Sequence, residues 1–402
     1  MSEAQPDAKV LTRVEPSERL MSLDALRGFD MFWIVGAEGL VRGFEKLGHS
    51  PGVEFVANQL KHKRWEGIAF EDLIFPLFVF MSGISIAFSL GKSIEQKGRW
   101  HTVGKIALRA LMLFVIGIFY SGGLKTSWPD IRLLGVLQRI ALSYFFAGAI
   151  FCFFGLRGRI AMLVGILVGY WAMMSFVPIP NDPGIASGRK PVAGEAPFPA
   201  RFDEGTNLSN YVDRHYLPGR RYDWSSKQNP LGDHDPEGLL STIPAIATCL
   251  LGVLAGMLLK NPNILPGRKT LLLLGAGIGC IGLGYLWGLQ FPIVKKLWTS
   301  SYVLVAGGWA FILLSAFYVV IDVLKWQKWS LPFVWIGTNA LVIYLSSTAI
   351  KFSDLANRFV GGDAVAVERF GLYATLVQAV ASLALLLLFA NFLYRRKIFI
   401  RI

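Results

Sequence analysis

Residues 61–90, KHKRWEGIAFEDLIFPLFVFMSGISIAFSL, decide the fold. The stretch begins with three basic residues and a histidine, passes Trp65 and the carboxylates Glu71 and Asp72, and is then almost wholly apolar. A helix needs about 20 mostly apolar residues to cross the roughly 30 Å of hydrocarbon in a bilayer. The stretch therefore predicts a membrane-spanning helix over residues 70–90, with a charged connection in front of it.

Apolar stretches of this length recur along the chain. Only 17% of the 402 residues are charged and 53% are hydrophobic, whereas soluble domains carry about 25% charged residues. The predicted fold class is an all-α polytopic membrane protein with about ten transmembrane helices. We predict spans at residues 24–41, 70–90, 104–120, 133–154, 160–177, 239–259, 270–288, 301–324, 331–350 and 372–394.

Lysine and arginine set the predicted orientation, because short cytoplasmic loops are enriched in them. With the N-terminus inside, the inner segments hold 17 of these residues and the short outer loops hold 12. Both termini are therefore predicted to be cytoplasmic, with a tail at 1–23 and a membrane domain at 24–402. The predicted outer loops include 42–69 and 178–238, and the second has the length of a lid or binding loop. The first 20 residues are polar, so no cleavable signal peptide is expected.

The first span carries charges where burial is expensive, which makes them functional candidates. Asp24, Arg27 and Asp30 are spaced three apart and can form a ladder of charges on one helix face. Glu38 follows Arg27 by eleven residues and returns to the same face about 16 Å further along. A structural ion-pair network and a functional stripe both fit this spacing. Glu38 has the stronger functional case, since we predict no partner for it in its own helix.

Other spans contain or adjoin polar side chains. Arg139, beside Gln138, must face the bundle interior and meet either Glu38 or an anionic ligand. Asn339, in the middle of a predicted span, needs a hydrogen-bond partner there and equally suits packing between helices.

Three positions next to spans have simpler explanations as well as functional ones. Asp72 suits the first turn of its helix, where negative charge is favourable. Asp235 is predicted to cap the sixth span, with Glu237 in its first turn. His62 stands just outside the second span, and an imidazole accepts a proton near neutral pH.

Several classes of chemistry are excluded by missing motifs. The sequence has no nucleotide-binding glycine loop, no HExxH and no cysteine–histidine metal set. We therefore expect no metal, and we interpret the three cysteines as small buried residues. The net charge of +13 is expected to face anionic lipid headgroups rather than nucleic acid. The glycine-rich run 275–284 is typical of helix packing.

The motifs together resemble those of the heparan-α-glucosaminide N-acetyltransferase family, over nearly the whole chain from about residue 19. The matching pieces are LDALRGFDMFW (23–33), KHKRWEGIAFEDLIFPLFVFMSG (61–83), GVLQRIALSYF (135–145), DPEGLLSTIPAIATCLLGVLAG (235–256), PFVWIGTNALVIY (332–344) and YRRKIFIRI (394–402). This chain shows no counterpart of the large lumenal N-terminal domain of the animal enzyme. A smaller amino sugar and a bacterial inner membrane are therefore expected.

The resemblance implies transfer of an acetyl group from cytosolic acetyl-CoA to a glucosamine amine across the membrane. The family's catalytic histidine falls on His62, and an asparagine of the animal enzyme falls on Glu38. We predict that Glu38 or Asp72 helps His62 in the proton transfer. The donor is placed near Arg19, Arg27, Gln138, Arg139 and Asn339, and the acceptor near Trp65, Asp235 and Glu237.

Two questions stay open at this level. His62 can act as a general base or as a transient acetyl carrier. The main alternative function is a sugar or muropeptide transporter without CoA chemistry, because ten spans and intramembrane charges suit it equally well. A homodimer is the assembly to test, since glycine-rich helices of such bundles often pair.

Overall fold

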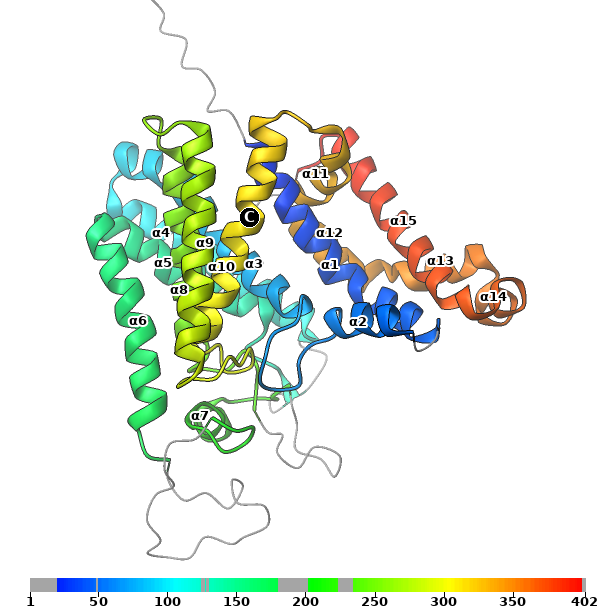
Figure 1. Ribbon diagram of the computed structural model, residues 1–402, viewed down its shortest axis with the longest axis horizontal. Helices are drawn as coiled ribbons and strands as arrows, with labels where there is room; N and C mark the ends of the chain where they lie inside the picture. Colours follow the sequence, from blue (N-terminus) through cyan, green and yellow to red (C-terminus); the bar gives the residue numbers. More distant parts are fainter. Residues whose placement is uncertain are drawn as a thin grey trace, which may run out of the picture.

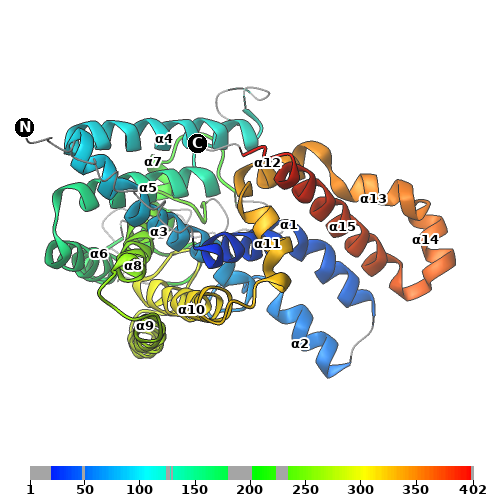
Figure 2. The ribbon, with the colours of Figure 1, turned by 90° about the horizontal axis from the view of Figure 1, so that it is seen from above.

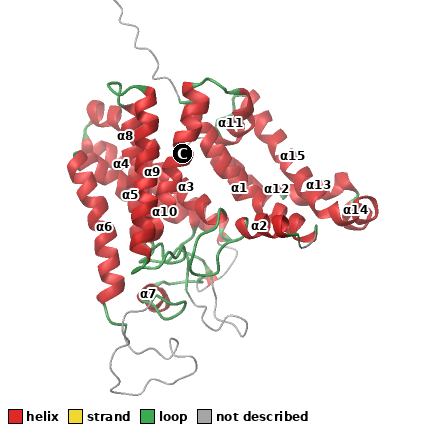
Figure 3. Cartoon of the chain, in the orientation of Figure 1, coloured by secondary structure: helices red, strands yellow, loops and turns green. Residues whose placement is uncertain are grey.

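The computed structural model describes residues 20–47, 50–123, 127, 130–179, 202–222 and 234–399. Within these ranges the regular structure is helical (Figure 3), and isolated β-bridges join Glu66 to Val294 and Arg132 to Gly219. The helices are α1 (Met21–Lys46), α2 (Pro51–Gln59), α3 (Glu71–Lys97), α4 (Arg99–Tyr120), α5 (Val136–Phe153), α6 (Leu156–Phe176), α7 (Leu208–Tyr216), α8 (Thr242–Lys260), α9 (Pro266–Gly288), α10 (Ser300–Phe317), α11 (Leu331–Gly337), α12 (Ala340–Ile350), α13 (Phe352–Val360), α14 (Gly362–Phe370) and α15 (Ala374–Arg395). The predicted all-α class is confirmed.

Each predicted span coincides with a helix or with a pair of helices. In the described part of the chain, eight helices are long and apolar enough to cross a membrane, or nine if one bent pair counts as a single span. The helix at the first predicted span, α1, is not among them because of its charged residues. It nevertheless packs against α3, α11 and α15 inside the bundle.

The predicted span 331–350 is a bent pair of helices and not one straight helix. The polypeptide bends by 71° between α11 and α12, and Asn339 lies at the break. The bend follows a very close crossing of α1 and α11, where a Cβ on Gly28 would lie 1.7 Å from the carbonyl oxygen of Phe333. Asn339 Nδ2 donates to the Ile398 carbonyl at 2.9 Å, so the C-terminal segment binds this side chain.

Close helix contact also forms the centre of the bundle. A Cβ on Gly83 of α3 would lie 1.9 Å from the Cys249 carbonyl oxygen, and one on Gly252 of α8 would lie 1.9 Å from that of Phe80. The interpretation of run 275–284 as packing surface is confirmed for two of its glycines, Gly277 and Gly284, which lie against α10.

Two ends of the molecule differ in character (Figures 1 and 2). At the termini end, the start of α1 lies beside α11 and the last turn of α15. The opposite end, here called the polar end, holds α7 and the connections 60–70, 234–241 and 289–299. Hydrogen bonds join these connections, for example from Gly67 N to the Ile293 carbonyl at 2.9 Å and from Trp65 Nε1 to the Phe202 carbonyl at 2.9 Å.

The close contact of α3 and α8 at Gly83 and Gly252 gives a prediction on stability. Gly252→Ala is expected to lower the yield and melting temperature of the detergent-solubilised protein, at a cost of about 1–3 kcal/mol or more, since its Cβ meets backbone that cannot move alone. Gly279→Ala is the matched control, because nothing lies within 4 Å of its Cβ position. Size-exclusion chromatography with thermal ramping measures both. An equal loss for both variants would contradict the role assigned to the crossing.

Candidate active site

The polar end is organised around the buried carboxylate of Asp72, in the first turn of α3. Its Oδ2 accepts the backbone N–H groups of Lys63 and Ala69, each at 3.1 Å. These two bonds fold connection 60–70 back over the start of the helix. His62 is thereby placed with its Nδ1 3.1 Å from Asp72 Oδ1. The His62 side chain is 59% exposed while that of Asp72 is fully buried, so Nε2 is the ring nitrogen left for chemistry.

A lysine that sequence reasoning missed completes this cluster. Lys295, in the connection between α9 and α10, places Nζ 3.1 Å from His62 Nδ1 and 3.3 Å from Asp72 Oδ1. Burial lowers the pKa of the Lys295 ammonium, and the charge of Asp72 opposes that effect. The sequence offered only a pair of lysines in a short loop 233 residues away from His62, which gave no reason to select it.

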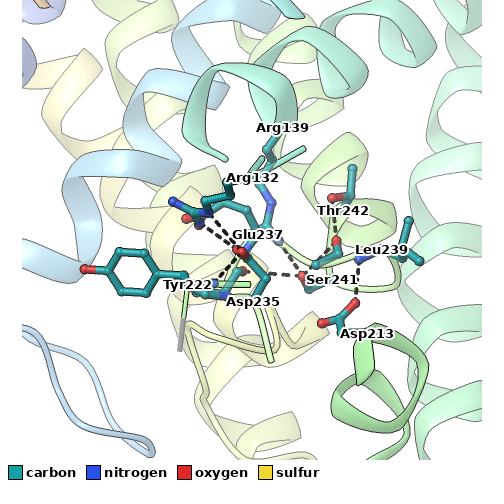
Figure 4. A network of polar contacts seen from close by, with 11 residues as sticks. Arg132, Arg139, Asp213, Tyr222, Asp235, Glu237, Leu239, Ser241 and Thr242 are labelled. Atoms are coloured by element: carbon teal, nitrogen blue, oxygen red, sulfur yellow. Dashed lines mark hydrogen bonds and ion pairs between the residues drawn. The ribbon is translucent and has the colours of Figure 1, made fainter. Parts of the chain in front are cut away.

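A second cluster contains two predicted residues, Asp235 and Glu237 (Figure 4). Arg132 binds Asp235 through two hydrogen bonds of 2.9 and 2.7 Å and donates to Glu237 at 2.6 Å. Burial lowers the pKa of the Arg132 guanidinium, but the two carboxylates raise it by more. The pKa of Arg132 therefore lies above its ordinary value. The predicted capping role of Asp235 is wrong, because α8 begins only at Thr242. Asp235 instead accepts from Arg132 and from the backbone N–H of Tyr222 at 2.9 Å.

Arg139 projects from α5 toward this second cluster. It donates to Ser241 Oγ (Figure 4) and its guanidinium lies 4.8 Å from the ring centroid of Trp298. The predicted alternative of a pair between Arg139 and Glu38 is therefore wrong. Gln138, its neighbour, is buried and packs against Gly117 of α4.

Trp298 connects the two clusters. Its ring contacts Arg139 on one side and Tyr302 on the other, with ring centroids 5.2 Å apart for the aromatic pair. Tyr302 Oη donates to the Asp72 carbonyl at 2.6 Å. Trp298 also has a φ of 52°, a left-handed conformation that side chains of its size rarely adopt and that is concentrated at functional sites.

The structure thus brings most of the predicted site residues to the polar end. Trp65 completes the group, since its ring lies 6.0 Å from the buried ring of His234, the residue before Asp235. The predicted residues that meet there are His62, Trp65, Asp72, Gln138, Arg139, Asp235 and Glu237.

Four predicted residues are not part of this site. Arg27 lies 3.7 Å from Asp24 and donates to Ser85, toward the termini end, and Asn339 is bound by the C-terminal segment. Glu38 does have a partner in its own helix, Arg42 at 2.5 Å, which corrects the expectation of none. It lines an 820 Å³ cavity between α1, α13 and α15, here called the distal cavity. Arg19 lies outside the described residues.

The fold and these clusters define a polytopic helical membrane protein with a histidine fixed by a buried aspartate at one end. Residues 19–128 match a family described as a domain of unknown function, DUF5009. The chain is 29% identical over 440 residues to human heparan-alpha-glucosaminide N-acetyltransferase, covering 100% of this chain and 62% of the relative. The mouse protein of the same name is 29% identical over 433 residues, with 97% and 62% covered. The similarity indicated by the motifs is therefore confirmed along the full chain, which spans 62% of the length of these relatives.

Asp213 of α7 contacts connection 234–241 and leads to a prediction on how stability depends on pH. Its Oδ1 accepts the Leu239 N–H at 2.8 Å, and the carboxyl packs against Gly238. Burial raises the pKa of Asp213 from 3.8 to about 7, and the nearby charge of Asp235 adds to this effect.

A raised carboxyl pKa contributes stability that is present below pH 3.8 and lost as pH rises through about 7. We therefore expect the melting temperature of the wild type to fall between about pH 4 and about pH 7 relative to that of Asp213→Asn, which keeps the Leu239 bond. Differential scanning fluorimetry in detergent measures this. Parallel pH curves for the two proteins would contradict the raised pKa.

Proposed function

We propose that this protein is a membrane acetyltransferase that moves an acetyl group from cytosolic acetyl-CoA to the amine of a glucosamine-type sugar at the polar end. The observation that carries the proposal is the His62–Asp72 pair, in a chain similar to curated N-acetyltransferases over its full length. The similarity to these relatives supports the acceptor class, and the bacterial inner membrane is part of the same proposal.

The proposed reaction balances as follows. An ammonium sugar cannot attack a thioester, so His62 first removes one proton from it. The free amine then attacks the thioester carbonyl carbon, the C–N bond forms and the C–S bond breaks. The second amine proton ends on the departing CoA thiolate. Asp72 holds the ring in position and stabilises the imidazolium during this step, because its buried carboxylate lies 3.1 Å from Nδ1.

A route through an acetylated His62 uses the same geometry. The exposed ring would attack the thioester carbonyl carbon, the C–S bond would break and the CoA thiolate would leave. The free amine would then attack the acetyl group, the bond to the imidazole nitrogen would break, and the released imidazole would take the proton that the amine loses. Both routes require that His62 is unprotonated at the start. The ammonium of Lys295 lies 3.1 Å from Nδ1.

The second cluster is proposed to shape the acceptor site. Asp235 is saturated by Arg132 and two backbone N–H groups, so its role is to position connection 234–241. Glu237 shares Arg132 and keeps an 11% exposed side chain, which leaves it the better candidate for contact with a sugar. Trp65 supplies an aromatic face next to His234, the residue before Asp235.

The first test is radiolabelled acetyl transfer from acetyl-CoA to glucosamine by the purified protein in liposomes. We expect transfer by the wild type and a loss of about 100-fold or more with His62→Ala or Asp72→Asn, the contribution of a positioned general base. Transfer that survives His62→Ala would remove His62 as the essential base. If neither transfer to an amino sugar nor CoA binding is detected, a transporter becomes the better proposal.

Lys295 gives a prediction on the rate of acetyl transfer. Lys295→Met is expected to lower the rate by about tenfold, because it removes the ammonium that lies 3.1 Å from His62 Nδ1 and 3.3 Å from Asp72 Oδ1. Lys296→Met is the control, because Lys296 lies 3.4 Å from Glu204 instead and its removal should leave the rate unchanged. An equal loss in both variants would show a general effect of surface charge.

A further inference from the structure

The distal cavity, of 820 Å³, has a polar wall although membrane helices form it. On one side α1 contributes Glu38 and Glu45, and on the other α15 contributes Gln378 and Ser382. The short helices α13 and α14 close the cavity beside the first turns of α15 (Figures 1 and 2). Polar side chains on membrane helices face a water-filled space rather than lipid. The distal cavity is therefore suited to a hydrated ligand.

Carboxylates outnumber cations in this wall. Four carboxylates and two cations line it, namely Glu38, Glu45, Asp354 and Asp363 with Arg42 and Lys46. Ion pairs with basic side chains hold both carboxylates of α1, Glu38 through Arg42 and Glu45 through Lys61. The excess of negative charge therefore comes from the side of the cavity that α13 and α14 form.

The two carboxylates on that side have no cationic partner in the described part of the chain. Asp354 lies in the first turn of α13 and Asp363 in the first turn of α14. Asp363 Oδ1 accepts a hydrogen bond from Gln378 Nε2 at 2.9 Å, which fixes the carboxylate against α15 without neutralising it. A carboxylate held in this way favours an ammonium group, because hydrogen bonds between charged partners are the strong ones.

The other end of α1 borders a cavity of opposite charge. That cavity measures 710 Å³ and is lined by Lys328, Arg395 and Lys397, with Asp24 as the one carboxylate among its lining residues. A small apolar gap, which Met31 lines, lies between the two cavities. Of the two large cavities along α1, the distal cavity is thus the one whose charge suits a cation.

Neutral groups in the distal cavity suit a sugar. Asn357 and Thr375 add an amide and a hydroxyl, and Tyr120 adds an aromatic ring. The ring of Tyr120 is held in place by stacking on Tyr344, with the centroids 4.5 Å apart. Pockets of about 300–1,000 Å³ that combine aromatic surface with a few polar groups are typical of small-molecule sites, and this cavity lies in the upper part of that range.

An ion pair connects the distal cavity to the candidate active site. Glu45, in its wall, binds Lys61, which precedes His62 in the chain. The His62 side chain is 59% exposed, so it is accessible to a ligand from outside the bundle. A chain of sugars whose first amine reaches His62 is therefore able to continue past Lys61 into the cavity.

We propose that the distal cavity binds the sugar units that adjoin the acetylated glucosamine, and that Asp354 and Asp363 select units with a free amine over N-acetylated or sulfated units. This inference rests on the proposed function. The preferred acceptor is then a cationic glucosamine oligosaccharide, because an N-acetyl group offers no charge to these carboxylates and a sulfate is repelled by them.

The test compares three acceptors in the liposome assay of acetyl transfer. They are glucosamine, a β-1,4-linked glucosamine trisaccharide, and the same trisaccharide with a free amine only at its non-reducing end and N-acetyl groups elsewhere. For the wild type we expect kcat/KM for the cationic trisaccharide to exceed the values for the other two by about tenfold, the effect of one or more charge-assisted hydrogen bonds.

Asp354→Asn/Asp363→Asn should remove this preference. We expect a rise of about tenfold in KM for the cationic trisaccharide, with its kcat and the values for glucosamine unchanged. Glu368→Gln is the matched control, because Glu368 is an exposed carboxylate of α14 outside the cavity wall and its removal should change none of the values. Elution volume and melting temperature confirm that each variant is folded, and the single variant Asp354→Asn provides a second measurement.

The other outcomes overturn the inference and separate it from the proposed function. Equal use of glucosamine and both trisaccharides, or an equal loss for glucosamine in the double variant, would remove the cavity from acceptor binding and leave the acetyltransferase intact. If the double variant loses only the thermal stabilisation given by phosphatidylethanolamine, the cavity binds the ammonium of a lipid headgroup instead. A wild type that transfers to none of the acceptors and does not bind CoA would remove the proposed function together with this inference.

Discussion

The arrangement of the polar end depends on one buried carboxylate. Asp72 accepts two backbone N–H groups from connection 60–70, contacts His62 and Lys295 with its other oxygen, and receives Tyr302 at its carbonyl. A charge buried this deeply is tolerated only when it is paired and hydrogen-bonded, and these partners come from three parts of the chain: connection 60–70, connection 289–299 and α10. The same requirement that stabilises the carboxylate therefore assembles the histidine, the lysine and α10 around it.

The second cluster satisfies the same requirement by a different arrangement. Asp235 and Glu237 share Arg132, and Arg139 lies close enough for Trp298 to contact it and Tyr302 together. The left-handed backbone at Trp298 is therefore maintained by contacts with both clusters. A change in one cluster is expected to reach the other through this side chain, because the buried ring of Trp298 contacts Arg139 and Tyr302.

Contacts between residues that are close in sequence could be predicted, and contacts between distant residues could not. Apolar length fixes the helices, and the His62–Asp72 contact spans only ten residues, so both could be predicted. The Arg132–Asp235 and Lys295–His62 contacts span 103 and 233 residues, and no local pattern encodes them. Asp235 and Pro236 resemble the start of a helix, but Arg132, which is 103 residues away in sequence, binds the Asp235 carboxylate instead. The break at Asn339 could not be predicted either, because it depends on how closely α1 approaches α11.

The helix α1 shows why charged residues in a bundle deserve a functional explanation. Its charges exclude it from the apolar spans, yet α3, α11 and α15 surround it, so its stability in the membrane comes from those neighbours. Asp30 is fully buried, and neither of its carboxyl oxygens has a hydrogen-bond partner within the described residues. An ordinary structural helix would replace such residues with leucine at a gain in stability. The charged sequence of α1 is best explained by its position, because this one helix borders both large cavities and the gap between them.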